Sequence, residues 1–201
     1  MRFVAVIALA LLASACAPFA LVPPQQRVTV KDALSVEPDI AWNKINTQDI
    51  TGRNQTETWT ADGPLLNTLT FFAGIEDGRP LFVQTAEQEK NNKLPEFRKT
   101  MTSTEIMELV EATHAKRARA ALIKTRNLRP EKFAGKDGFR FEMTYVGKDE
   151  VDRDVTVVGA VHNDRLYLIE YQGTHVYHYE LRRAQAERIM QNAQLVAAPG
   201  A

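Results

Sequence analysis

The sequence predicts an α+β fold, with a largely antiparallel sheet of about six or seven strands flanked by helices. Two observations predict it. Apolar and polar residues alternate with a period of two through several segments, which is typical of strands with one buried face. Two other segments repeat their apolar residues at helical spacing, so each helix can lie with one stripe against the sheet.

An early hairpin and a later three-stranded meander make up most of the predicted sheet. Asp62-Gly63 marks the early turn and Asn163-Asp164 marks the last turn of the meander, because these residues tolerate the backbone conformations of tight turns. A charged hairpin tip is expected at 147–154. The expected strands are 35–44, 55–60, 67–73, 120–128, 139–145, 155–161 and 165–171.

Both faces of the predicted sheet should be covered. Phe71 and Phe72 are adjacent in one strand, and neighbouring side chains on a strand face opposite sides. The first helix opens with a capping box, in which Thr102 and Glu105 satisfy each other's backbone N–H groups. The stripes expected to face the sheet are Ile106, Leu109, Val110 and Thr113 in the first helix, and Ala186, Ile189, Met190 and Ala193 in the second.

An N-terminal leader precedes the predicted domain. The amine of Met1 and the guanidinium of Arg2 are positively charged. Residues 3–12 then form an apolar run that is shorter than the ~20 residues of a membrane-spanning helix. Pro18 and two later prolines stop its continuation as a helix. The pattern predicts a secretory signal peptide over residues 1–15.

Residues 12–16, LASAC, resemble the lipobox of bacterial lipoproteins, although Ala13 stands where that family favours leucine. The resemblance implies cleavage before Cys16 after its sulfur has received a diacylglyceryl group. It therefore implies a lipid anchor in the bacterial cell envelope, facing the periplasm. By the family's sorting habit, neutral Ala17 implies the outer membrane more than the inner one.

An alternative is cleavage by the ordinary signal peptidase after the small residues 13–15, which leaves a soluble secreted protein with a free thiol. Cys16 is the only cysteine, so no second cysteine exists to pair with it in an oxidising envelope. Acylation accounts for the unpaired cysteine, and we expect the anchor.

The sequence beyond the leader divides into three parts. These are the acylated cysteine with a flexible tether (16–26), one globular α+β domain (27–195) and a disordered tail (196–201). The tether is expected because it contains three prolines and paired glutamines. Once Arg2 is removed, 24 basic side chains face 25 acidic ones, so bulk charge predicts no nucleic-acid partner.

The last third of the chain carries a second resemblance. Residues 135–141, with the pattern G-x-x-G-F-x-F, are followed by a charged turn, a hairpin ending in 166–169 and a terminal helix. This order resembles the back half of PsbP/Mog1-like α/β/α sandwich domains. The resemblance implies a scaffold used for binding and assembly more often than for catalysis, and it assigns no functional residue.

No catalytic constellation is present in the sequence. Ser35 and Ser103 lie outside any G-x-S-x-G elbow, and no H-E-x-x-H, P-loop or G-x-G-x-x-G motif occurs. Asp62, Asp77 and Asp137 precede glycines and are candidate carboxylates for an enzyme, but turn chemistry explains them. We expect neither an enzyme nor a cofactor.

Two histidines are candidate metal ligands. His175 and His178, with Glu170 and Glu180 near them in sequence, supply the imidazoles and carboxylates of an open divalent site. The alternative is that both histidines are hydrogen-bonding surface residues between a strand and a helix. Spacing alone is weak evidence for a metal site, so the second interpretation is favoured and no metal site is assigned.

A basic stretch is the candidate contact with anionic lipid headgroups or another acidic envelope polymer, since each cation near an anionic surface contributes about 1 kcal/mol. The alternative is a solvated face whose charges complement the helix dipole and nearby glutamates. The alternative is favoured. The residues concerned are Lys116, Arg117, Arg119, Lys124 and Arg126.

Three classes of function remain. The first, which is favoured, is a lipid-anchored structural or interaction protein with a partner in the envelope. The second is a carrier for a lipid or another hydrophobic ligand, and the third is an enzyme. A deep apolar cleft supports the carrier, whereas a filled core with an exposed apolar patch supports a docking protein.

Overall fold

The computed structural model describes residues 18–46 and 54–196. Its strands are β1 (Phe19–Val22), β2 (Val28–Val30), β3 (Leu34–Val36), β4 (Trp42–Ile45), β5 (Thr56–Thr60), β6 (Asn67–Ile75), β7 (Ala121–Phe133), β8 (Lys136–Val146), β9 (Asp152–His162), β10 (Arg165–Thr174) and β11 (Gln194–Leu195). The helices are α1 (Ala86–Asn92), α2 (Ser103–Arg117) and α3 (His178–Asn192).

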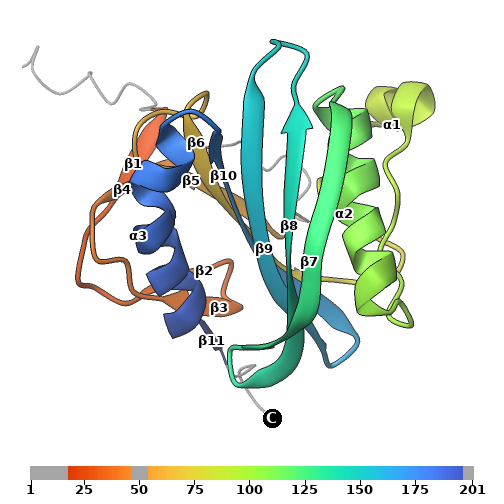
Figure 1. The fold of residues 1–201 in the computed structure, drawn as a ribbon. Helices are drawn as coiled ribbons and strands as arrows, with labels where there is room; N and C mark the ends of the chain where they lie inside the picture. Colours follow the sequence, from red (N-terminus) through yellow and green to blue (C-terminus); the bar gives the residue numbers. More distant parts are fainter. Residues whose placement is uncertain (1–17, 47–53, 197–201) are drawn as a thin grey trace, which may run out of the picture.

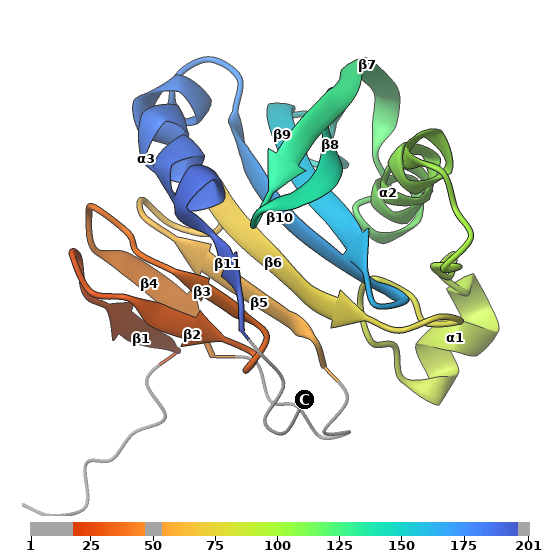
Figure 2. The same ribbon diagram turned by 90° about the horizontal axis from the view of Figure 1, so that it is seen from below.

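The middle layer is an eight-stranded antiparallel sheet in the order β1-β4-β5-β6-β10-β9-β8-β7 (Figure 1). Helix α3 and a small sheet of β11, β3 and β2 cover one face, and α2 covers part of the other, with α1 beside it (Figure 2). The predicted fold class is confirmed. Among the residues that the structure describes, none of the helices is both long and apolar enough to cross a membrane.

The expected six or seven strands are too few. The main sheet alone has eight, and the small sheet adds three. Strands β1, β2, β3, β4 and β11 are only two to four residues long, so they contain too few alternations for a period of two to show.

The meander of β8, β9 and β10 forms as predicted. Asn163 and Asp164 have φ of 49° and 62°, the left-handed conformation that a tight two-residue hairpin turn requires. The charged tip expected at 147–154 is shorter, because Asp152 already belongs to β9. Strand β7 extends beyond the expected 120–128, and register shifts interrupt it near Leu122 and Asn127, both with positive φ.

Both predicted helices form and bury the predicted stripes. In the capping box of α2, Glu105 N donates to Thr102 Oγ1 at 3.3 Å, and the Glu105 carboxylate accepts from Thr102 N at 2.7 Å. The buried residues are Ile106, Leu109, Val110 and Thr113 in α2, and Ala186, Ile189, Met190 and Ala193 at the end of α3.

The strand expected at 35–44 is wrong. The chain there forms β3 in the small sheet and then β4 in the main sheet, so it passes from one layer to the other. Pro38 lies between them and cannot donate to a sheet ladder. Its carbonyl instead accepts a hydrogen bond from Gln25 N at 2.7 Å.

Part of the tether expected at 16–26 is also wrong. Phe19–Val22 is β1, and all four of its residues pair with β4 at the edge of the main sheet. Pro23 and Pro24 follow directly and end the strand, because proline has no N–H. Cys16 and the leader lie outside the described residues, as do residues 197–201 of the expected tail.

Two apolar clusters fill the two faces of the main sheet. Phe71 packs into the cluster beneath α3, and Phe72 packs into the cluster beneath α2, as their adjacency predicts. The α3 cluster includes Trp42, Trp59, Ile169, Tyr171 and Ile189, and the α2 cluster includes Phe97, Ile106, Phe141, Val157 and Leu168.

A nearly buried arginine ties α3 to the sheet. Arg140 of β8 donates from Nη1 to Glu187 of α3 at 2.7 Å and from Nε to Glu131 of β7 at 2.9 Å. Burial opposes the charge of Arg140, but the two carboxylates outweigh burial and raise its pKa. Because three elements share these charges, their relative positions are fixed.

Candidate interaction surface

Exposed apolar side chains gather at one end of the described structure. Leu65 and Leu66 lie in the β5–β6 connection, and Val176 and Tyr177 lie in the β10–α3 connection. Their exposed fractions are 75%, 36%, 93% and 59%, in that order. A hydrogen bond of 3.0 Å from Thr174 N, at the end of β10, to Leu66 O holds the two connections side by side. We call these four residues the apolar end, and such grouping is typical of a contact surface.

Turn chemistry fixes the β5–β6 connection. Gly63 has φ of +123°, a conformation that favours glycine. Its carbonyl accepts from the backbone N–H groups of Leu66 and Asn67 at 2.9 and 3.1 Å. Thr60 Oγ1 accepts from Gly63 N at 2.9 Å. The backbone that carries the two leucines is therefore held by its own hydrogen bonds.

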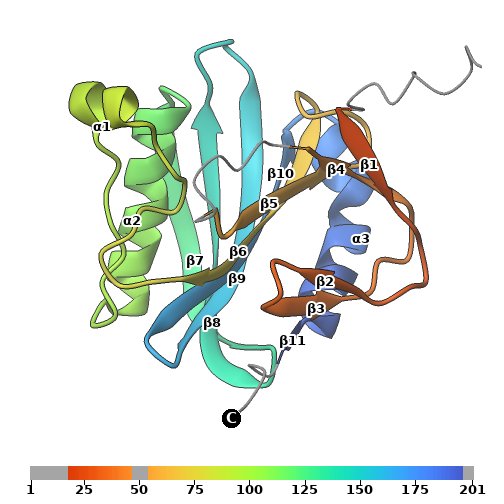
Figure 3. The same cartoon turned by 180° about the vertical axis from the view of Figure 1, so that it is seen from behind.

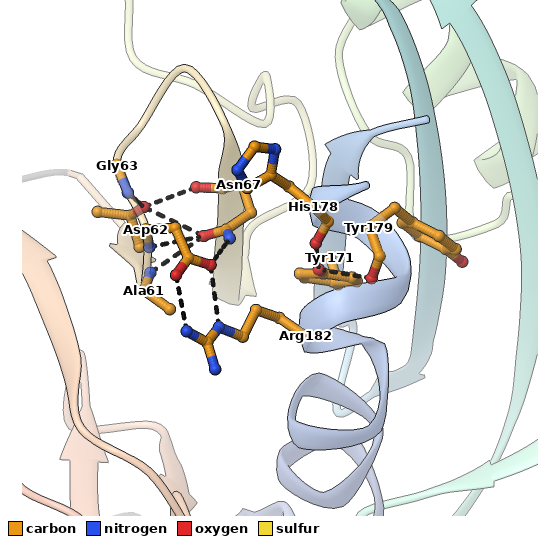
Figure 4. Close-up of polar contacts among 9 residues, drawn as sticks. Ala61, Asp62, Gly63, Asn67, Tyr171, His178, Tyr179 and Arg182 are labelled. Carbon is orange, nitrogen blue, oxygen red and sulfur yellow. Dashed lines mark hydrogen bonds and ion pairs between the residues drawn. The ribbon is translucent and has the colours of Figure 1, made fainter. Parts of the chain in front are cut away.

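A polar network binds the same connection to α3 (Figure 4). Asp62 accepts from Nε and Nη2 of Arg182 at 2.9 and 2.7 Å, and also from the side-chain amide of Asn67. Asn67 Oδ1 in turn accepts from Ala61 N at 3.0 Å. The hydrogen bonds from Arg182 hold the pKa of Asp62 below its ordinary value, so the carboxylate stays charged at neutral pH.

The β10–α3 connection is fixed from the sheet. The Tyr171 hydroxyl lies 2.9 Å from the carbonyl oxygens of both His178 and Tyr179, so it donates to the backbone at the start of α3. At Gly173, an added Cβ would lie 2.6 Å from Tyr179 Cα. The lack of a side chain there allows α3 to approach β10 closely. A surface fixed in this way loses little conformational entropy when it binds.

The two candidate metal ligands have separate partners. His175 Nδ1 lies 2.6 Å from Asp154 Oδ2, which raises the pKa of His175, and His178 Nδ1 lies 3.0 Å from Thr174 Oγ1. Glu170 is not brought to them, because its side chain lies on the α2 side of the sheet. Within residues 18–46 and 54–196, no three His, Cys, Asp or Glu side chains are grouped to hold a metal ion.

Each of the three aspartates beside glycines has a hydrogen-bonding partner. Asp62 belongs to the network described above. Asp77 Oδ1 accepts from Lys99 N at 2.9 Å, and Asp137 pairs with Lys132 across the β7–β8 hairpin. These contacts join each turn to a neighbouring segment of the chain.

The basic stretch is divided between the two faces of the main sheet. Lys116 and Arg117 end α2, and Arg119 follows it. Lys124 and Arg126 instead pair with even-numbered positions of β8, whose odd-numbered residues line the α2 cluster. These two cations therefore lie on the α3 side. The five basic residues of the candidate stretch therefore do not share one face, because the register of β7 turns Lys124 and Arg126 away from the end of α2.

A cleft of about 920 Å³ lies at the end of α2. Thr56 and Thr58 of β5 line it, and α1 forms one wall. The Arg117 guanidinium lies 3.6 Å from the centre of the Phe82 ring, and burial lowers the pKa of Arg117. A neighbouring cleft of about 650 Å³ contains several charged side chains. Both are lined mostly by polar and charged residues, unlike a cavity for an apolar ligand.

Sequence reasoning missed a buried polar contact beneath α2. His114 Nε2 lies 3.0 Å from Glu170 Oε2, and the two side chains are only 11% and 5% exposed. The Tyr145 ring lies beside His114, and the Tyr145 hydroxyl donates to Gln172 at 2.8 Å, while burial raises the pKa of Tyr145. His114 and Glu170 are 56 residues apart, so no local pattern signals the pair.

The fold can be compared with known proteins. No protein-family model and no curated protein matches the chain. Among solved structures, the chain is similar to the solution structure of cyanobacterial PsbP (CyanoP) from Synechocystis sp. PCC 6803. The TM-score is 0.56 at 10% identity, with 91% of this chain and 98% of that one covered. The chain has a PsbP-like fold. At this identity, the likeness to PsbP shows the fold alone.

A second similar structure is the crystal structure of LpqN, involved in cell envelope biogenesis, of Mycobacterium tuberculosis. The TM-score is 0.34 at 8% identity, and the match covers 90% of this chain and 94% of LpqN. At that TM-score, the similarity to LpqN supports no argument about this protein.

Proposed function

We propose that the protein is a lipid-anchored, non-catalytic interaction module of the bacterial cell envelope. One observation carries the proposal. The apolar side chains on both faces of the sheet are packed in two filled clusters, while four more are exposed together at the apolar end. A filled core beside an exposed apolar surface fits docking better than transport of a hydrophobic ligand.

The anchor is supported by the sequence. The leader over residues 1–15 ends at the only cysteine, in a pattern that resembles a lipobox. One acyl chain alone binds a membrane marginally, whereas the two or three chains of a lipoprotein hold it durably. The protein then faces the periplasm, and neutral Ala17 favours the outer membrane.

The candidate polar groups already have partners within the protein, and this supports a non-catalytic role. Asp62 is bound by Arg182, and His175 is bound by Asp154. A general base or nucleophile needs free access to a substrate, and these contacts instead hold turns and connections in place.

Mass spectrometry of the mature protein tests the anchor. We expect the N-terminal residue to be Cys16 with a diacylglyceryl thioether, and the protein to fractionate with the outer membrane. The variant Cys16→Ser lacks the sulfur and should no longer carry the lipid. A mature chain with a bare Cys16 thiol, or with residues 1–15 still attached, contradicts the proposal.

The alternative is a carrier for a lipid or another hydrophobic ligand, and the size of the larger cleft, about 920 Å³, favours it. The polar lining of this cleft argues against a carrier for a hydrophobic ligand. Native mass spectrometry of the protein purified from its host distinguishes the two functions. We expect the mass of the protein alone, whereas a co-purifying hydrophobic molecule indicates the carrier.

A further inference from the structure

The larger cleft lies between α1 and the end of α2, and we call it the α1–α2 cleft. Figure 3 shows α1 beside the end of α2 that leads into β7. Thr56 and Thr58 line the cleft from the sheet. Its volume of about 920 Å³ lies within the roughly 300–1,000 Å³ that is typical of ligand sites. The α1–α2 cleft is therefore large enough for a ligand much bigger than a single ion.

Hydrogen bonds hold the walls of the α1–α2 cleft together. Asn92 Nδ2 donates to Lys116 O at 3.1 Å, and Lys116 Nζ donates to Lys93 O at 2.6 Å. Gln84 donates from Nε2 to Asn92 O at 2.9 Å and accepts from Leu94 N at 2.8 Å. The chain before α1 is thus joined to the chain at its end, and both are joined to α2. Because these walls are already held in place, little conformational entropy is lost when a ligand binds.

The lining of the α1–α2 cleft is positively charged. Lys116, Arg117 and Arg119 line it, and Glu87 is the only acidic side chain among the described residues that do so. The whole chain, in contrast, has 25 basic and 25 acidic side chains. The neighbouring cleft of about 650 Å³ is lined by two basic and three acidic side chains, which are Arg79, Lys93, Glu76, Glu89 and Glu96. Positive charge is therefore concentrated in the α1–α2 cleft, and a cleft focuses the attraction of such charges for an anion.

These three cations have no carboxylate partner. Within residues 18–46 and 54–196, none of them forms an ion pair. The Arg117 guanidinium lies over the Phe82 ring instead. Glu170 acts on Arg117 only at longer range, and its carboxylate contacts His114. A carboxylate of a ligand can supply the missing partner, because a guanidinium binds a carboxylate through two parallel hydrogen bonds.

The rest of the lining offers mainly hydrogen bonds. Three threonines, three asparagines and two glutamines belong to its described part. Their hydroxyl and amide groups can pair with the hydroxyls of a sugar, which both donate and accept. Among the described residues of the lining, Phe82 is the only aromatic one, and Arg117 covers one face of its ring. Charge and hydrogen bonds, rather than ring stacking, are therefore available for recognition.

We propose that the α1–α2 cleft binds an acidic oligosaccharide with carboxylates on its sugar rings. Arg117 and Arg119 bind the carboxylates, Lys116 adds its charge, and the hydroxyl and amide side chains bind the ring hydroxyls. An acidic peptide fits less well, because peptides use apolar pockets or a free strand edge, and β5 lies between β4 and β6 within the sheet. Binding at this cleft requires neither the proposed lipid anchor nor the apolar end.

Calorimetric titration of the full-length protein with trigalacturonate tests the chemistry of the ligand. The comparison ligands are maltotriose, which has three neutral rings, triglutamate and inorganic phosphate. We expect trigalacturonate to bind about tenfold more tightly than each of them, because it alone combines carboxylates with ring hydroxyls. Equally tight binding of maltotriose, triglutamate or phosphate overturns the proposal, since the cleft would then recognise a neutral sugar, a peptide or a simple anion.

A matched pair of double variants tests the place of binding. Arg117→Gln/Arg119→Asn removes two cations from the cleft, and asparagine tolerates the φ of 48° at position 119. Lys124→Gln/Arg126→Gln removes the same charge from the α3 side of the sheet. We expect the affinity for trigalacturonate to fall about tenfold in the first variant and to change less than about twofold in the second. An equal loss in both, or no loss in the first, overturns the proposed site.

A second measurement needs no substitution, so it remains decisive if a variant fails to fold. Amide NMR signals of the unsubstituted protein are followed during titration with trigalacturonate. We expect the signals of residues 84–92 and 116–119 to shift, and those of residues 76–79 beside the neighbouring cleft to stay unchanged. Shifts confined to residues outside the α1–α2 cleft, or no shifts at all, overturn the proposal.

Discussion

Two connections at opposite ends of the main sheet, β5–β6 and β7–β8, present different side chains. At the apolar end, the turn at Asp62-Gly63 carries two leucines, of which Leu65 is 75% exposed. At the opposite end, the β7–β8 turn is flanked by the ion pair of Lys132 and Asp137. The side chains within and beside each connection determine the surface that it presents.

The two ends also differ in how firmly they are fixed. The ion pair of Asp62 and Arg182 is bidentate, with side chains only 19% and 28% exposed, and it joins a hairpin to α3. The pair of Lys132 and Asp137 is solvent-exposed, and such pairs contribute little to stability. The β5–β6 connection is thus held more firmly by its ion pair than the β7–β8 turn is by the pair of Lys132 and Asp137.

The largest expected difference between the ends comes from two glycines. Gly173→Ala should lower the free energy of unfolding by about 3 kcal/mol, because the new Cβ meets the backbone of Tyr179. Gly135→Ala, in the β7–β8 turn, meets no atom within 4 Å and should cost only about 1 kcal/mol for its positive φ. Urea denaturation of both variants measures the difference. Equal losses would show that α3 does not need its close approach to β10.

The second largest difference is expected in the free energy of unfolding when the ion pair at each end is removed. Asp62→Ala should lower the free energy of unfolding by about 2 kcal/mol, because it removes charge-assisted hydrogen bonds that are partly shielded from water. Asp137→Ala is the matched control, and no measurable loss is expected there. Hydrogen exchange should also quicken at the amides of residues 63–67 in the first variant alone. If exchange at those amides in Asp62→Ala is as slow as in the unsubstituted protein, the pair does not hold the β5–β6 connection in place.

The smallest expected effect is a pH dependence at the apolar end. The hydrogen bond to Asp154 raises the pKa of His175 above its ordinary value of 6.5. The contact therefore stabilises the fold below that ordinary value, and the contribution is lost as pH rises through the raised pKa. The effect is small because the imidazole is exposed. An NMR titration of His175 should show the raised pKa, and Asp154→Asn should bring it back toward 6.5. An unchanged pKa in that variant would exclude Asp154 as the cause.

Local patterns were sufficient to predict the elements that are long and regular. The turn at Asn163-Asp164 and the capping box of Thr102 and Glu105 depend on neighbours in sequence, so the residues themselves carry the information. The opposite directions of Phe71 and Phe72 follow from the geometry of any strand. These features gave the fold class and the need to cover both faces of the sheet.

Short edge strands could not be predicted in the same way. Strand β1 has four residues beside prolines, and its conformation is set by its pairing with β4, some 20 residues later. The same sequence resembled a tether because prolines suit both a linker and the end of an edge strand. The register shifts in β7, which turn Lys124 and Arg126 to the α3 side, likewise have no signature in the local alternation.

By itself, the sequence determined the fold class, the meander, the helix stripes and the pattern that resembles a lipobox at Cys16, because each is a property of consecutive residues. Only the tertiary structure brought Leu66 beside Thr174 and Asp62 beside Arg182, which lies 120 residues away. Such contacts form because the sheet order places distant segments at a common end. The apolar end is therefore a feature of the folded chain, and no single segment of the sequence contains it.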